Sequence, residues 1–419
     1  MRRVVVTGIG TINSTGHNVK DSFEAVVNGV CGIDAITLFD ASEFSVKIAG
    51  EVKDFDPTTV MDKKEVKKAD RFIQLGIKAA LEAMIDSGYV TQENKKVDAS
   101  IADRFGMISG SGIGGLSTIE RNSVVCETKG SRKVSPFFIP SSLANMLSGF
   151  ISIEHNLRGP SLSHVTACAA STHALNDAVK TIMIGGADRV LVVGAESAIC
   201  AAGVAGFAAM KALSTRNDDP KKSSRPFDID RDGFVMGEGA GALVVEDLEL
   251  ALARGAKIYA EIIGFGESGD ANHITSPVMD GPLRAMQAAF EMAKNITGEY
   301  PKIDYINAHG TSTPVGDKNE TAAIKALFGG QENAPLVSST KGQIGHCLGA
   351  AGAIEAIFTI KALNEGIIPP TINIENQDPE CDLDYIANVA RKADLTTVMS
   401  NNFGFGGTNG SVIFKKYTK

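Results

Sequence analysis

The residue best placed to do chemistry is a cysteine at the junction of a predicted strand and a predicted helix. Cys168 lies in the segment TACAAS, which leads into an alanine-rich helix. A cysteine in the first helical turn is close to the positive end of the helix dipole and to free N–H groups, which favour the thiolate. Its small neighbours would let an acyl group approach the sulfur. This segment alone is equally compatible with a buried, inert cysteine.

Two histidines and a lysine follow strand-like segments farther along the chain. His309 stands in NAHGTST, and Lys341 and His346 stand in KGQIGH. Both are turns of small residues just past an apolar run, where open α/β sheets bind ligands. Neutral imidazoles can donate N–H bonds to a carbonyl that becomes an enolate, or can transfer a proton. Lys341 adds a fixed positive charge, and Glu355 on the next predicted helix is its natural partner. Together with Cys168, these residues favour catalysis at a thioester.

A glycine-rich loop lies near the C-terminus. Residues 401–409 read NNFGFGGTN. Glycines allow the backbone to approach a ligand closely and leave Phe405 free to swing. Phe405 is therefore a candidate gate of a pocket, and its backbone N–H is a candidate donor to an oxyanion. A wide β-bulge with phenylalanines in the core is the alternative.

Two other sequence patterns concern nucleotide binding and metal binding. Residues 110–115, GSGIGG, match the G-x-G-x-x-G of dinucleotide-binding loops, but no clear second strand ending in an acidic residue follows. NAD-linked oxidation stays an alternative on this motif. The six cysteines are scattered, without a C-x-x-C pair or the Cys/His spacing of a zinc site. We therefore expect no metal, and thiols that are reduced and mostly pack as small hydrophobes.

Charge and hydropathy exclude further classes of protein. The formal net charge is −8, which argues against a nucleic-acid-binding surface. No apolar stretch approaches the roughly 20 residues that span a bilayer, and the apolar run after MRR ends too early for a secretory signal. We expect a soluble, cytoplasmic protein without a nucleic-acid or membrane partner. Small basic clusters are either solvated surface or a docking site for an acidic partner: Lys64, Lys67, Lys68, Arg132, Lys133 and Lys211.

Short β-branched segments alternate with helical ones along the chain. This alternation predicts an α/β protein with largely parallel sheets that are buried on both faces. The expected strands are Arg3–Thr7, Phe105–Ser109, Arg189–Val193, Ala240–Glu246, Ala260–Phe265, Tyr305–Ala308, Leu336–Ser339, Thr397–Ser400 and Gly410–Phe414. The expected helices, with glycines at or near their C-terminal ends, are Asp70–Asp86, Ala169–Ile184, Asp317–Phe328 and Gly349–Leu363.

The two halves of the chain share a broad design. Each contains a strand, a turn of small residues and a helix, around Cys168 in the first half and around His346 in the second. This indicates a duplicated α/β unit, with residues 1–255 carrying the cysteine and residues 256–419 carrying the histidines, the lysine and the glycine loop. Without a low-complexity linker, we expect the halves to pack as one body.

Five motifs in order resemble a known family. TACA, RPFDIDRDGFVMGEGA at residues 225–240, NAHGTST, KGQIGH and NFGFGGTN together resemble the β-ketoacyl-[acyl carrier protein] synthases I and II. The elongating type II enzymes are closest in length and in detail. The resemblance implies a thiolase-like α/β fold, a five-layer α-β-α-β-α sandwich of two similar halves, usually in a homodimer. It also implies no bound cofactor, because the phosphopantetheine arm arrives on the acyl carrier protein.

The resemblance also implies a reaction. An acyl chain moves from its carrier protein to Cys168, and malonyl-[acyl carrier protein] loses CO2 while His309 and His346 stabilise the enolate. The enolate then attacks the thioester and gives a 3-oxoacyl-[acyl carrier protein] lengthened by two carbons. Backbone N–H groups of Cys168 and Phe405 would form the oxyanion hole, and Lys341 with Glu355 would provide electrostatic support.

Further residues match family positions by resemblance alone. Those expected to line the acyl, malonyl and pantetheine sites are Ile113, Thr275, Thr311, Thr313 and Phe403. The six residues of the basic clusters match the carrier-protein docking surface.

Several relatives can be separated by their chemistry. Type III synthases pair the cysteine with His and Asn, whereas this chain has His346 at the later position. Thiolases need a second cysteine in the C-terminal loop, where this chain has Phe405. A type I synthase, a polyketide-type ketosynthase and a non-catalytic chain-length or scaffold subunit stay open as alternatives. The intact Cys168 argues against the non-catalytic subunit.

Overall fold

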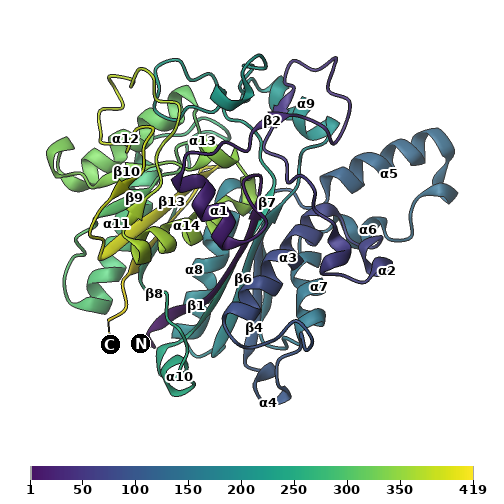
Figure 1. Ribbon diagram of the computed structural model, residues 1–419, viewed down its shortest axis with the longest axis horizontal. Helices are drawn as coiled ribbons and strands as arrows, with labels where there is room; N and C mark the ends of the chain where they lie inside the picture. The colour runs from purple at the N-terminus through teal and green to yellow at the C-terminus, as the bar shows by residue number, and fades with distance from the viewer. Residues whose placement is uncertain (1, 419) are drawn as a thin grey trace.

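The computed structural model describes residues 2–418 and is built around one ten-stranded mixed sheet (Figure 1). The strand order is β10-β9-β13-β14-β8-β1-β7-β6-β4-β5. These strands are β1 (Val4–Asn13), β4 (Phe105–Gly110), β5 (Ser161–His164), β6 (Arg189–Glu196), β7 (Gly239–Asp247), β8 (Ala260–Gly269), β9 (Tyr305–Asn307), β10 (Leu336–Ser338), β13 (Thr397–Gly404) and β14 (Thr408–Lys415). Two small ribbons pair β2 (Asp34–Ala35) with β3 (Ile48–Ala49), and β11 (Ile367–Ile368) with β12 (Arg391–Lys392).

The sheet consists of two halves with the same internal arrangement. In the first half, β5, β4 and β6 run parallel, and β7 and β1 continue the half with antiparallel pairs. In the second half, β10, β9 and β13 run parallel, and β14 and β8 continue it in the same way. An antiparallel pair between β1 and β8 joins the halves. The expectation of two similar halves is confirmed.

The expectation of largely parallel sheets is wrong, because five of the strand pairs in the large sheet are antiparallel and four are parallel. The physical reason is clearest at β13 and β14, which only residues 405–407 separate. A parallel crossover needs a dozen or more residues. A loop this short can therefore only form an antiparallel hairpin.

The helices form three layers around the two halves of the sheet (Figure 1). Helices α3 and α7 pack on the outer face of the first half, and α11 and α12 cover the second half. Helices α8 and α14 lie between the halves and contact both. The helices are α1 (Val19–Val27), α2 (Lys63–Val66), α3 (Arg71–Asp86), α4 (Ala99–Ala102), α5 (Leu116–Lys129), α6 (Phe138–Ser142), α7 (Met146–His155), α8 (Ala170–Met183), α9 (Ala201–Ala209), α10 (Leu248–Ala253), α11 (Asp280–Thr297), α12 (Pro314–Phe328), α13 (Lys341–Ile344) and α14 (Ala351–Glu365).

The position of α14 in the central layer explains why this helix is largely apolar on all sides. Residues 351–360 of this helix are all buried, since sheet or helix surrounds it on every side. A helix that is apolar all round is typical of such a core position. The layers therefore follow the order α-β-α-β-α, as the five-layer expectation requires.

In the part of the chain that the structure describes, no helix is both long and apolar enough to cross a membrane.

Candidate active site

The cysteine lies on a short, constrained connection between β5 and α8. A single 3-10 turn, Ala167–Ala169, carries it, and Ala167 takes a left-handed backbone conformation with φ of 50°. The glycine loop packs directly against this turn. A Cβ atom on Gly404 would lie 2.9 Å from the Thr166 carbonyl oxygen and 3.1 Å from the Cys168 nitrogen, so only glycine fits without displacement. Thr408 Oγ1 also donates to the Thr166 carbonyl, at 3.0 Å.

The thiol of Cys168 is protonated in the resting site. Burial raises the pKa of Cys168 to about 12, although the Lys341 charge and the backbone N–H groups of Phe405 and Cys168 act in the opposite direction. The expectation that the helix start favours a thiolate is therefore wrong, because desolvation of the sulfur outweighs the dipole and the N–H groups. The two N–H groups that reach the sulfur are those expected in the oxyanion hole.

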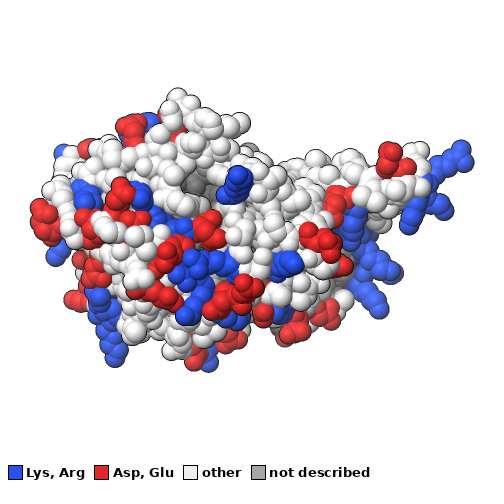
Figure 2. Space-filling model, turned by 90° about the horizontal axis from the view of Figure 1, so that it is seen from above, with Lys and Arg blue, Asp and Glu red and all other residues white. Residues whose placement is uncertain are grey.

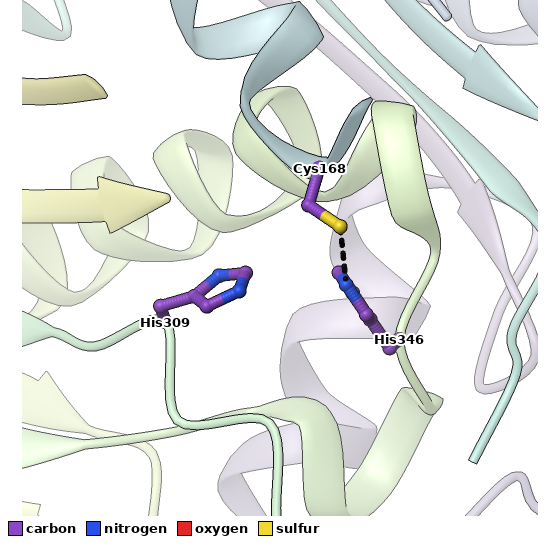
Figure 3. A group of neighbouring side chains, drawn as sticks. All are labelled: Cys168, His309 and His346. Atoms are coloured by element: carbon purple, nitrogen blue, oxygen red, sulfur yellow. Dashed lines mark hydrogen bonds between the residues drawn. The ribbon is translucent and has the colours of Figure 1, made fainter. Parts of the chain in front are cut away.

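His346 and His309 both face the sulfur (Figure 3). His346 follows α13 and places its Nε2 atom 3.0 Å from Cys168 Sγ, within hydrogen-bonding distance. His309 follows β9, and its ring stands nearly perpendicular to that of His346 at a centroid distance of 5.3 Å. Aromatic rings hold both imidazoles in place, Phe234 against His346 and Phe403 against His309.

Both imidazoles are neutral at physiological pH. Burial, followed by the Lys341 charge, lowers the pKa of His309 and of His346 well below the ordinary value of 6.5. A neutral imidazole can accept a proton at one nitrogen while it donates from the other. The pair can therefore act as a base toward the thiol and as hydrogen-bond donors toward a carbonyl oxygen.

Lys341 is the source of the positive charge in this site. Its Nζ pairs with the Glu355 carboxylate on α14, and both side chains are almost fully buried. The second Glu355 oxygen accepts a hydrogen bond from Asn402 Nδ2 at 2.7 Å. The ion pair thus links α13, α14 and β13 behind the catalytic face.

A cavity of about 400 Å³ leads to these residues, and the face of the molecule seen from above is hollowed (Figure 2). Its lining includes Cys168, His309 and His346. Six further residues singled out in the sequence also line it: Lys211, Thr275, Thr311, Thr313, Phe403 and Phe405. Phe405 is 36% exposed, and its ring lies 6.4 Å from that of Phe207 across the cavity lining.

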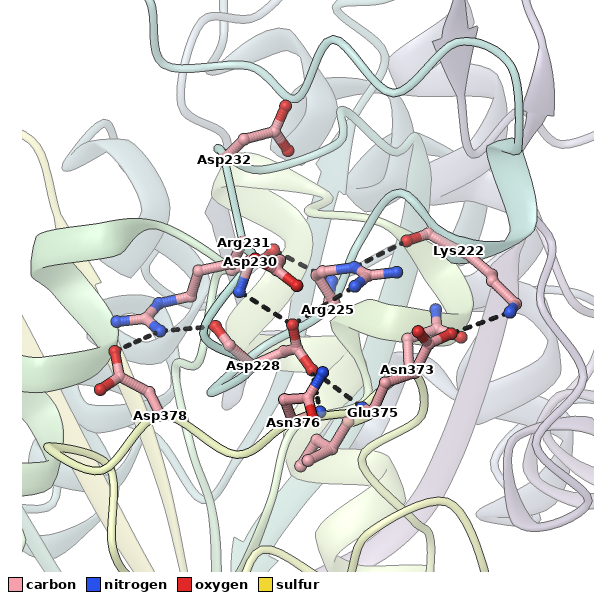
Figure 4. A network of polar contacts seen from close by, with 12 residues as sticks. Lys222, Arg225, Asp228, Asp230, Arg231, Asp232, Asn373, Glu375, Asn376 and Asp378 are labelled. Carbon is pink, nitrogen blue, oxygen red and sulfur yellow. Dashed lines mark hydrogen bonds and ion pairs between the residues drawn. The ribbon is translucent and has the colours of Figure 1, made fainter.

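A network of charged residues braces the turn that holds Thr311 and Thr313 (Figure 4). Arg231 donates to the carbonyl oxygens of Thr313 and Pro314 and forms an ion pair with Asp378. Asp228 accepts from the backbone of Glu375, Asn376 and Asp230. The RPFDIDRD motif therefore supports the site and does not enter it.

The GSGIGG loop binds a carboxylate of the protein itself. Glu196, at the end of β6, accepts from the N–H groups of Gly112 and Ile113 and from the Ser111 hydroxyl. It also accepts from Gly349, two residues before α14. A buried side chain thus fills the place that a phosphate would need, which removes the nucleotide-binding alternative for this loop. Ile113 packs in the apolar cluster that contains Cys168, outside the lining of the open cavity.

Two buried carboxyl groups at the site were missed in the sequence, Glu196 and Glu320. Glu320 on α12 accepts from the N–H groups of His309 and Gly310, at 2.9 and 2.8 Å. Burial raises its pKa to about 7. A weak signal was present, because α12 begins directly after NAHGTST and Glu320 lies in its second turn.

The basic clusters occupy different elements. Lys64 and Lys67 are exposed on and next to α2, whereas Lys68 is half-buried, pairs with Glu65 and lies 5.8 Å from the Phe137 ring. Arg132 and Lys133 are exposed beyond the C-terminus of the projecting helix α5, and Figure 2 shows basic side chains gathered at this projecting end. Lys211 lies instead at the catalytic cavity.

Comparison with protein families gives two adjacent matches. Residues 1–251 match the model of the β-ketoacyl synthase N-terminal domain, and residues 259–375 match that of the C-terminal domain.

Individual relatives match over the whole chain. A 3-oxoacyl-[acyl-carrier-protein] synthase 2 from Vibrio harveyi is 50% identical over 419 residues, 99% of each chain. The enzyme of that name from Staphylococcus aureus (strain COL) is 48% identical, again over 99% of each chain. A β-ketoacyl synthase structure from Burkholderia phymatum superposes with a TM-score of 0.91 at 36% identity, with full coverage of both chains. A type II polyketide ketosynthase solved in complex with its acyl-carrier protein superposes with a TM-score of 0.86 at 30% identity, over 99% of this chain and 100% of that one.

Proposed function

The chain belongs to the β-ketoacyl synthase family, and from this premise we propose that it elongates acyl chains in fatty-acid synthesis. It condenses an acyl group held on Cys168 with malonyl-[acyl carrier protein], releasing CO2 and 3-oxoacyl-[acyl carrier protein]. The observation that carries this function is the approach of a thiol and two neutral imidazoles at the end of one cavity. The enzyme uses no free cofactor, because the phosphopantetheine is part of the carrier protein.

The first half-reaction transfers the acyl group to Cys168. Because the resting thiol is protonated, its attack needs a base, and the neutral Nε2 of His346 at 3.0 Å is positioned to accept the proton. The backbone N–H groups of Cys168 and Phe405 bind the oxyanion of the tetrahedral intermediate. The intermediate expels the pantetheine sulfur, which takes the proton from His346 as the carrier leaves, so the imidazole is neutral again.

The second half-reaction makes the carbon nucleophile. His309 and His346 donate hydrogen bonds to the thioester carbonyl of the malonyl group, so the electrons left by departing CO2 collect on an enolate oxygen. The enolate carbon attacks the acyl carbonyl on Cys168, and the same N–H groups bind the second oxyanion. Collapse of this intermediate breaks the C–S bond and returns the sulfur to Cys168.

Lys341 and Glu355 support both steps without touching the substrate. The Lys341 charge adds to burial in keeping the imidazoles neutral, and each can donate to the enolate in the tautomer that carries its proton on the nitrogen facing the cavity. Glu355 satisfies the ammonium group and prevents an isolated charge in the core.

The remaining site residues are proposed either to line the substrate pocket or to gate it. Phe405 is proposed as the gate, since it is half-exposed between glycines and faces Phe207. Ile113 is proposed at the far wall of the acyl pocket, supported by its place in the apolar cluster around Cys168. Thr275, Thr311, Thr313 and Phe403 are proposed to contact the malonyl group and the pantetheine arm, supported by their place in the cavity lining.

The carrier protein is proposed to dock on Lys211 at the cavity and on the basic clusters next to α2 and beyond α5, which consist of Lys64, Lys67, Lys68, Arg132 and Lys133. A solved relative bound to its acyl-carrier protein supports a carrier as the partner. Basic side chains in a chain of net charge −8 would steer an acidic partner to one region.

We further propose a cytoplasmic homodimer. Strand β5 is the edge of the large sheet, and Leu162 on it, Val165 just after it and Ile153 on α7 are 47%, 57% and 78% exposed. Exposed apolar edges are normally covered, and pairing of β5 with its counterpart would cover this one. All six cysteines are free thiols, which suits a reducing compartment.

The alternative is a non-catalytic chain-length subunit of a synthase complex, and one solved structural neighbour is a ketosynthase/chain length factor. Intact-protein mass spectrometry after incubation with acyl-[acyl carrier protein] separates the two. The proposed enzyme gains one acyl mass that maps to Cys168 and is absent from Cys168→Ala. A protein that gains no acyl mass is not the enzyme proposed here.

A further inference from the structure

The three catalytic side chains form a cluster of metal-type donors. Within residues 2–418, one group of three His, Cys, Asp or Glu residues brings its ligand atoms within 4.8 Å of one another, and it consists of Cys168, His309 and His346. A sulfur and two imidazole nitrogens are the donors that zinc prefers. Mg²⁺ and Ca²⁺ need several oxygen donors, which this cluster does not offer.

The spacing of the donors suits a tetrahedral ion after small side-chain rotations. Zn–S bonds of ~2.3 Å and Zn–N bonds of ~2.0–2.1 Å at tetrahedral angles separate the donors by about 3.3–3.6 Å. Cys168 Sγ and His346 Nε2 are 3.0 Å apart, slightly less than this, and the widest separation in the cluster stays within 4.8 Å. A shift of about an ångström, within reach of side-chain torsions, meets the requirement.

The surroundings leave one coordination position open. The three residues occupy the end of a cavity of about 400 Å³ that opens to solvent, so a hydrated ion has a route in and can keep one water ligand. Phe234 and Phe403 fix the planes of the two imidazoles. The nitrogen Nδ1 of each histidine is buried without a hydrogen-bond partner among the described residues. Metal-bound histidines usually gain affinity from such a partner, so binding here is reversible and weaker than in structural zinc sites.

We propose that the unacylated site binds one thiophilic divalent cation, such as Zn²⁺, through Cys168 Sγ and a ring nitrogen each of His309 and His346. Binding replaces the thiol proton, which leaves to solvent, with a metal–sulfur bond, and no oxidation or reduction occurs. The bound ion occupies the sulfur that an acyl group would need. Metal and acyl group therefore exclude each other, and the ion inhibits the first half-reaction. The binding rests on the donor geometry alone, whereas the inhibition also rests on the proposed function.

Cobalt(II) is the probe, because a thiolate ligand gives it a charge-transfer band and tetrahedral geometry gives it intense visible bands. The expected result is one Co²⁺ bound per chain with both features, displaced by one equivalent of Zn²⁺ and unaffected by Mg²⁺. Cys168→Ala should lose the charge-transfer band. His346→Ala removes a ligand and should weaken binding by more than the roughly 10- to 100-fold that loss of an outer-shell partner costs. Cys126→Ala and His17→Ala, changes at a thiol and an imidazole outside the cavity lining, are the matched controls.

Alkylation of the Cys168 thiol tests metal binding without measuring the condensation reaction. In the Cys126→Ala background, iodoacetamide treatment of Cys168 should abolish the cobalt spectrum. The proposal is overturned if wild-type enzyme shows no thiolate–cobalt band. It is equally overturned if that band survives in Cys168→Ala or in the alkylated protein, because the ion would then bind elsewhere.

Discussion

At the scale of single residues, Cys168, the proposed nucleophile, is partly buried and protonated, and its neighbours can supply what the attack requires. The opposing effects on Cys168 are desolvation, which raises the pKa, and Lys341 with two N–H groups, which lower it. Desolvation is the larger effect. In the proposed mechanism, His346 therefore acts in acylation as well as in decarboxylation, because a thiol at 3.0 Å needs a proton acceptor.

A pH profile of alkylation tests this ionisation state. Because the pKa is raised to about 12, the thiolate fraction of Cys168 should grow by about tenfold per pH unit from neutral pH to about pH 10. The iodoacetamide rate at Cys168, measured by mass spectrometry in the Cys126→Ser variant, should follow this rise without a plateau. A plateau near neutral pH would instead indicate a thiolate–imidazolium pair. Circular dichroism at each pH controls for unfolding.

Sequence motifs were sufficient to find Cys168, His309, Lys341 and His346, because each stands in a turn of small residues after a strand. They could not reveal the direction of the cysteine pKa shift, which depends on how deeply tertiary packing buries the sulfur. Glu196 was missed because it ends an ordinary apolar strand, and its four hydrogen-bond partners come from segments up to 153 residues away.

At the scale of elements, the site is assembled where four strands end. β5 leads to Cys168, β9 to His309, β10 to Lys341, and the hairpin of β13 and β14 brings Phe405 to the sulfur. The edge strands β5 and β10 come from different halves of the sheet. The complete site therefore exists only when the halves pack together. This packing depends on the close approach of the glycine loop to the cysteine turn.

Gly404→Ala tests that approach. A Cβ at this position meets backbone atoms at 2.9 and 3.1 Å, so the loop must move and carry the Phe405 N–H away from the oxyanion. Loss of one oxyanion donor costs about 100- to 1,000-fold in kcat. Steady-state condensation assays should show this loss in kcat, with the cysteine turn still folded.

Gly206→Ala is the matched control, because among residues 2–418 no atom outside its own stretch of α9 lies within 4 Å of a Cβ at that position. It should retain full kcat. Wild-type kcat in Gly404→Ala would mean that the loop does not supply the donor.

All nine strands predicted from the sequence overlap observed strands, since β-branched runs bounded by small residues are a strong signal. The strand before Cys168 was expected without bounds, because the sequence of β5, SLSH, is short and partly exposed and contains a single apolar residue. Helices α5 and α11 were not predicted. In α5 the apolar face is weak, because the helix projects from the body and covers little core (Figure 1).

At the scale of the whole molecule, we expect basic side chains next to α2 to recognise the carrier protein. Charge reversal in the double variant Lys67→Glu/Lys68→Glu should raise the KM for acyl-[acyl carrier protein] with little change in kcat, because these side chains act on association and not on chemistry. The increase in KM should shrink at high salt. Lys392→Glu, at an exposed lysine on β12, is the control. An unchanged KM in the double variant removes α2 from the docking surface.

We also expect two copies of the chain to associate through the edge of the sheet at β5. The paired changes Leu162→Asp and Val165→Asp place charges on the exposed edge next to β5, where a second chain would bury them. Light scattering should give the mass of a dimer for wild type and of a monomer for this variant. Ile184→Asp, at a side chain 83% exposed beyond α8, should stay dimeric. A monomeric wild-type protein would contradict the proposed dimer.

In the proposed reaction, Cys168 holds the acyl chain while His309 and His346 make the carbanion. Release of CO2 from malonyl-[acyl carrier protein] by Cys168→Ala tests it most directly, with acetyl-[acyl carrier protein] as the second product. Decarboxylation should persist in this variant although condensation is abolished. It should fall by roughly 100- to 10,000-fold when His309 or His346 is also replaced by alanine. Absence of CO2 release from Cys168→Ala, or release that does not depend on the two histidines, would contradict the account.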